Sequence, residues 1–299
     1  MAFYHLEEEM GLVLKDIVNK LFNNKRDYST NDLGITWINY KKENNFHMGF
    51  GYGINNKKQI YPASLVKLIY GLAINAWIEK KRIIYNEELN NAVFKMLFDS
   101  SNDATSYIVD ILTGTTSGPS LEGEIWKQWK CQREIINDWI LSLKWEELDA
   151  CNCCQKTWED GPFGREKDFY GENNSNRNSL TTDATARIME EIMKNTKYIP
   201  ENIDLKNCLH RTLNRDKIIR NSNNQIEGFL GEGLPEKISF WSKAGLMSEA
   251  RHDSAWWLNN DLSITLLVVF GNGKAFAKDN LFLPKIAQAI YEFNQRNVI

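Results

Sequence analysis

YPASLVKLIY, residues 61–70, opens a segment in which apolar side chains recur at helical spacing as far as Trp77. The spacing predicts a helix with one well-defined buried face that begins at Ser64. Lys67 follows Ser64 by three positions, and a helix places residues with that offset on one face within contact distance. We therefore expect the two side chains to meet at the helix start.

This serine–lysine pair is a candidate for nucleophilic catalysis. The backbone N–H groups and the dipole at a helix start favour the negative charge that develops when a hydroxyl loses its proton. Lys67 can take that proton only when it is neutral, so burial and neighbouring cations must lower its pKa from about 10.4. Taken alone, S-x-x-K fits an N-cap serine followed by a surface lysine equally well.

Two further short motifs favour the catalytic interpretation. Ser100-Ser101-Asn102 lies within MLFDSSNDATSYIVDIL, at a predicted turn among helices, and Lys243-Ala244-Gly245 lies within FWSKAG, on a predicted strand. The chain thus carries S-x-x-K at a helix start, S-x-N at a turn and K-x-G on a strand, in that order. The joint pattern is more specific than any one of its parts.

The rest of the chain predicts an α/β (α+β) fold. An amphipathic N-terminal helix precedes a β-hairpin at 33–53, the pattern stays mostly helical from about 86 to 206, and strands and a closing helix follow. The expected fold is an antiparallel sheet built from both chain ends, flanked by the terminal helices, with an all-helical lobe inserted. The sheet domain would comprise 1–72 and 207–299, and the helical domain 73–206.

In motif order and context the chain resembles the superfamily of serine β-lactamases and penicillin-binding DD-peptidases. It is most similar to class A β-lactamases and to β-lactamase-like serine hydrolases of cyanobacteria, and the resemblance runs from the hairpin at 33–53 to the final helix. It implies a β-lactamase/transpeptidase-like fold and a serine hydrolase that cleaves an amide, lactam or ester. It implies no metal and no organic cofactor.

The resemblance gives three side chains a catalytic role. Ser64 becomes acylated, Lys67 removes its proton, and Ser100 relays that proton onward. The backbone N–H groups of Ser64 and Leu246 would form the oxyanion hole, with both donors aimed at the charge that forms during attack.

The resemblance also implies how a substrate is held. Asn102 would hydrogen-bond a substrate amide carbonyl and Lys67 together. Lys243 would supply positive potential for a substrate carboxylate and help to lower the pKa of Lys67. Gly245 would let the strand edge approach the substrate.

The third motif departs from the family pattern, because Ala244 stands where Thr or Ser is usual and the hydroxyl that helps to bind a substrate carboxylate is missing. Arg251, on the next predicted strand, is a candidate replacement, since a guanidinium binds carboxylates as a fork. An ordinary exposed strand-end arginine is an equal interpretation. Ser101 stands where class A enzymes have aspartate, and we expect only a local structural effect there.

The long irregular segment at about 150–180 lacks the E-x-x-L-N signature with which class A enzymes position a hydrolytic water. Glu166 is the first candidate substitute and Glu172 the second. Either glutamate could equally be a loop residue paired with Arg165 or Arg177. Without such a carboxylate the acyl-enzyme would decay slowly, as in a penicillin-binding protein.

Composition narrows the choice of partners. Lys plus Arg is 36 and Asp plus Glu is 39, so the net charge of −3 gives no reason to expect nucleic acid or an anionic membrane. The five cysteines are odd in number and lack zinc-ligand spacing, so no metal is expected. Three consecutive glutamates near the N-terminus do not fit a secretory peptide, and the apolar run at 262–270 is too short to span a bilayer. These features predict a cytoplasmic location.

The expected partner is a small-molecule substrate: a β-lactam, or a D-amino-acid peptide or ester. Two other functions stay open. One is penicillin-binding, DD-peptidase or D-amino-acid esterase activity with slow β-lactam turnover, and the other is a noncatalytic binding protein that retains the fold. Retention of both serines and both lysines favours catalysis. The oligomeric state is not predicted.

Overall fold

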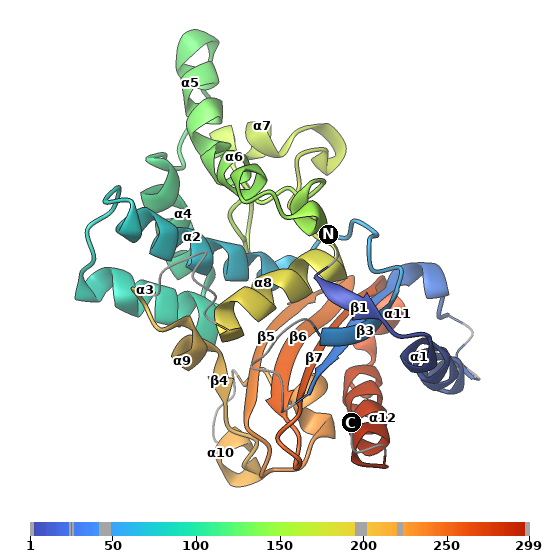
Figure 1. Ribbon diagram of the computed structural model, residues 1–299. Helices are drawn as coiled ribbons and strands as arrows, with labels where there is room; N and C mark the ends of the chain where they lie inside the picture. The colour runs from blue at the N-terminus through green and yellow to red at the C-terminus, as the bar shows by residue number, and fades with distance from the viewer. Residues whose placement is uncertain are drawn as a thin grey trace.

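The computed structural model describes residues 3–23, 25, 27–41, 49–194, 202–219 and 224–296. Figure 1 shows a sheet with helices on both faces and, beside it, a region built of helices. The sheet contains seven strands in the order β1-β3-β2-β7-β6-β5-β4. Because β2 pairs with β7, strands from the two ends of the chain lie side by side.

The strands are short and mostly antiparallel. Their bounds are β1 Tyr4–Leu6, β2 Leu33–Tyr40, β3 Gly49–Ile54, β4 His210–Arg211, β5 Phe240–Met247, β6 Ala250–Leu258 and β7 Ile264–Asn272. β2 and β3 form the predicted hairpin, and its connection at 42–48 lies outside the described residues. The predicted α/β fold with an antiparallel sheet is confirmed, except that β1 pairs with β3 in parallel. A three-residue strand is too short for the alternating pattern that predicts strands.

Alternate side chains of the central strands face opposite layers. Trp37 and Leu267 belong to the core beneath the terminal helices, whereas Ile38 and Leu266 belong to the core on the other face of the sheet. The first layer contains α1 (Glu8–Phe22), α11 (Lys274–Lys278) and α12 (Phe282–Arg296), and the second contains α8 (Thr182–Lys194). The sheet is therefore covered on both faces.

The helical region is built around α2 (Lys67–Glu79), which is buried along almost its whole length. The remaining helices of the described chain are α3 Glu87–Phe98, α4 Asn102–Thr113, α5 Gly123–Arg133, α6 Ile135–Ser142, α7 Gly164–Tyr170, α9 Leu205–Leu209 and α10 Arg215–Ile219. None of the helices in the described ranges is long and apolar enough to cross a membrane. The division into a sheet domain, 1–72 with 207–299, and a helical domain, 73–206, stays a prediction.

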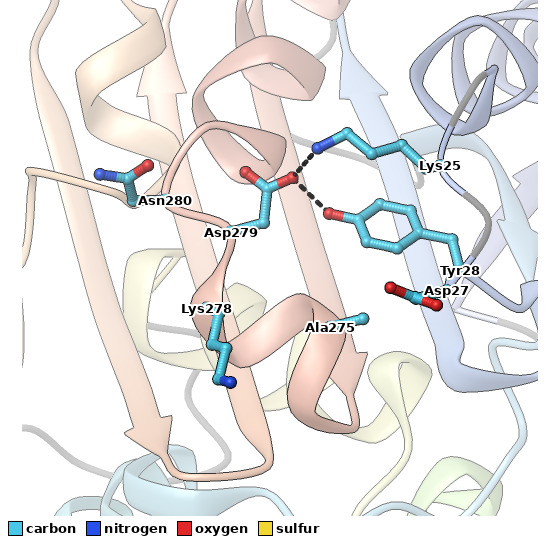
Figure 2. A pocket seen from close by; sticks show the side chains of 7 residues that line it. All are labelled: Lys25, Asp27, Tyr28, Ala275, Lys278, Asp279 and Asn280. Atoms are coloured by element: carbon cyan, nitrogen blue, oxygen red, sulfur yellow. Dashed lines mark hydrogen bonds and ion pairs between the residues drawn. The ribbon is translucent and has the colours of Figure 1, made fainter.

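Figure 2 shows an open pocket of about 640 Å³ where the chain beyond α1 meets the end of α11. Its Asp279 carboxylate accepts hydrogen bonds from Lys25 Nζ at 2.6 Å and from the Tyr28 hydroxyl. Burial raises the pKa of Asp279, but these hydrogen bonds outweigh burial and lower it to about 2. Because the folded pKa is lower than the ordinary value, the contact stabilises the fold above about pH 4 and loses that effect as the pH falls toward 2.

Candidate active site

Ser64 lies in a 3-10 turn, η2 (Ala63–Val66), that leads directly into α2. β5 crosses this turn so closely that a Cβ atom on Gly245 would lie 3.0 Å from the carbonyl oxygen of Pro62 and 3.2 Å from the Ser64 nitrogen. A side chain at position 245 would push the strand away from the turn. Glycine is therefore needed for the approach of β5 to the backbone of Ser64, and the approach of this strand edge to a substrate stays a prediction.

Lys67 is fully buried at the first position of α2. Its ammonium group donates hydrogen bonds to the backbone oxygen and the hydroxyl of Ser100, and to Asn102 Oδ1 at 2.9 Å. Burial lowers the pKa of Lys67 to about 7, against the charge of Glu159, which raises it. A lysine with this pKa is neutral in a substantial fraction of molecules near pH 7, as a proton acceptor must be.

Ser100 connects the two lysines of the motifs. Its hydroxyl lies 3.2 Å from Lys67 Nζ and 2.9 Å from Lys243 Nζ, and its backbone has a left-handed φ of 60°. Ser101, the next residue, is the N-cap of α4, and its hydroxyl accepts a hydrogen bond from the Ala104 N–H. Ser101 therefore has the expected local structural effect, because a serine caps a helix as well as an aspartate does.

Lys243 is fully buried on β5 and donates to Ser100 Oγ, to Gln225 Oε1 at 2.8 Å and to the backbone oxygen of Ala244. Burial lowers its pKa well below the ordinary value, and the charges of Lys67 and Arg211 lower it further. The charge of Lys67 therefore disfavours protonation of Lys243, as a like charge in a buried site does. This pair and Ser100 form a continuous hydrogen-bonded path.

Gln225 is a nearly buried residue of this site that no sequence motif predicts. Its side-chain oxygen accepts hydrogen bonds from Lys243 Nζ and from the Ala244 N–H at 2.9 Å, and its amide donates to the Phe98 carbonyl. The Ala244 N–H thus points away from β6, toward the free edge of β5. Because strand orientation repeats every two residues, the Leu246 N–H points to the same edge, beside Ser64.

Replacing Gln225 tests this arrangement. Gln225→Ala removes the shared acceptor, so acylation of Ser64 should slow by about 10-fold. Gln225→Glu restores an acceptor with a negative charge, which raises the pKa of Lys243 and shifts the pH dependence of acylation. The measurement is the pH–rate profile of acylation. Gln288→Ala, on the exposed side of α12, is the control. If the wild type, both Gln225 variants and this control gave identical pH–rate profiles, a positioning role for Gln225 would be excluded.

Residues 86–294 match the family described as "Beta-lactamase enzyme family". The chain belongs to this family. The matched range contains Ser100, Asn102 and Lys243, whereas Ser64 and Lys67 precede it. A search of curated proteins finds no match.

Solved structures of β-lactamases share the fold at low sequence identity. TLA-1 extended-spectrum β-lactamase is 12% identical with a TM-score of 0.65, and the alignment covers 94% of this chain and 98% of that one. A point mutant of PBP-A, solved as an acyl-enzyme complex with penicillin G, is also 12% identical with a TM-score of 0.64, covering 96% and 97%. A β-lactamase from Chitinophaga pinensis is 13% identical with a TM-score of 0.62, covering 94% and 98%. The family match confirms the predicted superfamily, and these structures confirm its fold.

The side chain of Arg251 does not hydrogen-bond to Lys67, Ser100 or Lys243. Its guanidinium donates to the backbone oxygen of Gly228 at 3.0 Å and, through two nitrogens, to that of Ala277 at 3.1 and 3.2 Å. These contacts tie β6 to α11 and to the loop at Gly228, and they engage all three guanidinium nitrogens. The alternative of a structural strand-end arginine fits this geometry.

Glu166, the first candidate for directing the deacylating water, lies in a buried ionic cluster. Its carboxylate is fully buried and accepts hydrogen bonds from Arg133 at 2.7 Å and from the Ser117 hydroxyl at 2.8 Å, with Lys156 Nζ at 3.7 Å. These contacts make the carboxylate an anchor of the 150–180 loop. Glu166 therefore pairs with an arginine, as the alternative interpretation expects, but that arginine is Arg133 rather than Arg165 or Arg177. Glu172 lies on the exposed turn η4 (Glu172–Asn174).

The same loop carries two residues of the site that sequence reasoning missed. Thr157 donates a hydrogen bond of 2.7 Å to Asn102 Oδ1, the oxygen that also accepts from Lys67. Both donors fix this oxygen, so the asparagine amide N–H₂ is free to point elsewhere. Glu159, two residues further on, is exposed, and its charge acts on Lys67. No pattern in the segment TWED at 157–160 predicts these contacts, because the partners Asn102 and Lys67 lie far away in sequence.

Proposed function

We propose that this member of the β-lactamase enzyme family is a serine hydrolase that cleaves an amide, lactam or ester through an acyl-enzyme on Ser64. The observation that carries the proposal is the Ser100 hydroxyl hydrogen-bonded to two buried lysines, Lys67 and Lys243, beside the turn that holds Ser64. In the part of the chain that the structure describes, neither ammonium group has a carboxylate partner in hydrogen-bond range. Such a pair destabilises the fold, and groups of this kind cluster at active sites.

Acylation uses this path for proton transfer. Neutral Lys67 removes the proton of the Ser64 hydroxyl while Ser64 Oγ forms a bond to the carbonyl carbon of the substrate. The bond from that carbon to the leaving nitrogen or oxygen then breaks, and the leaving atom receives its proton from Ser100, which is replenished from Lys67. The low pKa of Lys67 makes both transfers accessible near pH 7.

The oxyanion of the tetrahedral intermediate would be held by the N–H groups of Ser64 and Leu246. Gly245 brings β5 close to the Ser64 nitrogen, and the Leu246 N–H points to the same edge as the Ala244 N–H, which Gln225 occupies. Donors fixed in this way need no rearrangement when charge develops, and one such donor contributes about 3 kcal/mol.

Deacylation would use Glu159 as the base that activates water. Glu159 is exposed to solvent and its charge raises the pKa of Lys67, whereas Glu166 is fully buried in an ionic cluster. Glu159→Gln should still become acylated, but its acyl-enzyme should persist about 100-fold longer than that of the wild type. Adduct decay followed by intact-mass spectrometry measures this lifetime. Asp160→Asn, the neighbouring exposed carboxylate, is the matched control; equal decay in both variants and the wild type would exclude Glu159.

The substrate is a small molecule, and β-lactams, D-amino-acid peptides and D-amino-acid esters are the candidates. Slow decay of every adduct would favour penicillin-binding or esterase-like behaviour over β-lactamase turnover. A noncatalytic binding protein is the remaining alternative. The experiment that tests the proposal is hydrolysis of a chromogenic β-lactam and a chromogenic ester by the wild type and by Ser64→Ala. We expect turnover of at least one compound in the wild type and its loss in the variant, with an unchanged melting temperature.

A further inference from the structure

Arg177 contacts two segments that flank Ser64, and no ion-pair partner for it occurs among the described residues. Its guanidinium carbon is 3.4 Å from the centre of the Tyr61 ring, and Tyr61 precedes Ser64 by three residues. One of its terminal nitrogens is 3.7 Å from the sulfur of Met247, at the end of β5. The side chain therefore links the segment that leads into the nucleophile turn with the strand that carries the proposed oxyanion donor.

Two hydrogen bonds hold the backbone of Arg177 in place. Its backbone N–H donates to the Asn174 carbonyl, and its own carbonyl accepts a hydrogen bond of 3.1 Å from Asn152. Tyr61 is held in turn, because His252 of β6 makes a 3.0 Å hydrogen bond to its carbonyl oxygen. A guanidinium stacked on an aromatic ring keeps its planar edge oriented, which favours bidentate binding of a carboxylate.

The charge of Arg177 is not neutralised within the described residues. No carboxylate in those ranges forms an ion pair with it, whereas Arg133 of α5 is paired with Glu166. The Nε atom of Arg177 is shielded from solvent and lacks a hydrogen-bond partner in the described structure. The guanidinium also lowers the pKa of Tyr61 against the larger effect of burial, as its closeness to the tyrosine requires.

The direction of a bound substrate follows from where its leaving group must lie. The leaving group needs a proton from Ser100, which Lys243 holds at the inner part of β5. The acyl group extends from the attacked carbonyl to the opposite side. β5 continues from Lys243 to Met247 over four residues, about 13 Å of strand. The acyl group is therefore directed toward Met247, where Arg177 lies.

We infer that Arg177 determines specificity by binding a carboxylate on the acyl group of the substrate. This inference rests on the proposed function. It names the substrate class as acyl compounds with a terminal acidic group, and it separates this subsite from Lys243 at the leaving-group end. The exposed Leu246 and Met247 side chains, 53% and 40% accessible, offer apolar surface to the chain between the carbonyl and the carboxylate.

The test uses paired thioesters of glutaryl, adipyl and pimelyl acyl groups, each with a terminal carboxylate or the corresponding carboxamide. The rate of Ser64 acylation is measured for each pair. At one or more lengths, the wild type should react about 10-fold faster with the carboxylate. Arg177→Gln should abolish this preference, so that the two members of each pair react at equal rates. Arg177→Lys should keep part of the preference, because lysine retains the charge but loses the fork.

Arg82→Gln is the matched control, because it removes an arginine that stacks on Trp77 at 5.1 Å in the helical region. Its preference should equal that of the wild type. A wild-type preference near one at every length, or a preference that survives in Arg177→Gln, would overturn the inference, as would an equal loss of both rates, which indicates a packing role. Absence of any adduct on the wild type would instead contradict the proposed function, and the inference with it.

Discussion

Lys67→Met should slow acylation of Ser64 by about 1,000-fold and remove its dependence on pH near neutrality. In the wild type, only neutral Lys67 accepts a proton, and burial lowers the pKa of Lys67 to about 7. The wild-type rate should therefore rise as the pH increases through about 7 and level off above it. Methionine retains the length and apolar stem of lysine, so the buried site should stay filled.

The measurement for Lys67 is the acylation rate from about pH 5.5 to about pH 9, a range that brackets this pKa on both sides, with folding checked by circular dichroism. Lys95→Met is the control, since Lys95 is exposed and pairs with Asp99 on the surface of α3. It should reproduce the wild-type profile. A Lys67→Met protein that acylates at the wild-type rate, with the same rise through pH 7, would show that another group is the base.

Glu166→Gln should lower the free energy of unfolding by about 3 kcal/mol, because the Arg133–Glu166 pair has both side chains fully buried. Neutralising the carboxylate leaves a buried guanidinium without its counter-charge. Arg133 retains Asp110 at only 3.7 Å, and Asp110 is already engaged by Lys156. Urea denaturation at pH 7 measures the loss.

Glu124→Gln removes one partner of an exposed ion pair with Lys127 and is the control for Glu166→Gln. Its effect should stay within about 0.5 kcal/mol, because exposed pairs contribute little. The lifetime of the acyl-enzyme gives a second readout. If Glu166→Gln kept full stability and accumulated a long-lived adduct, Glu166 would be the deacylation base and the anchoring role would be excluded.

Sequence predicts the parts of the site that local spacing determines. Ser64 and Lys67 are three residues apart where the 3-10 turn leads into α2, as the spacing predicts, and contact between their side chains stays a prediction. Ser100 and Asn102 flank the N-cap Ser101, whose capping bond fixes the start of α4. Lys243 and Gly245 lie on a strand whose apolar and aromatic neighbours identify it. The local geometry of each short motif follows from its sequence, and the order of the three motifs indicates the family.

Sequence does not predict the contacts that link the motifs. Gln225 approaches Lys243 only because the loop before η5 (Leu230–Gly233) returns to the free edge of β5. Glu166 has the composition of a catalytic loop glutamate, and only its burial against Arg133, 33 residues away, reveals an anchor. Arg251 has the same ambiguity, resolved by two backbone carbonyls. Such pairings depend on tertiary packing, which no local pattern contains.

The most direct test of the central claim is intact-mass spectrometry with peptide mapping after incubation with a fluorescent penicillin and, separately, a fluorophosphonate. We predict that at least one probe adds a single covalent mass to the wild type, that the modified peptide contains Ser64, and that Ser64→Ala gains no mass. An adduct on another residue, an adduct that persists in Ser64→Ala, or no adduct with either probe would contradict the account.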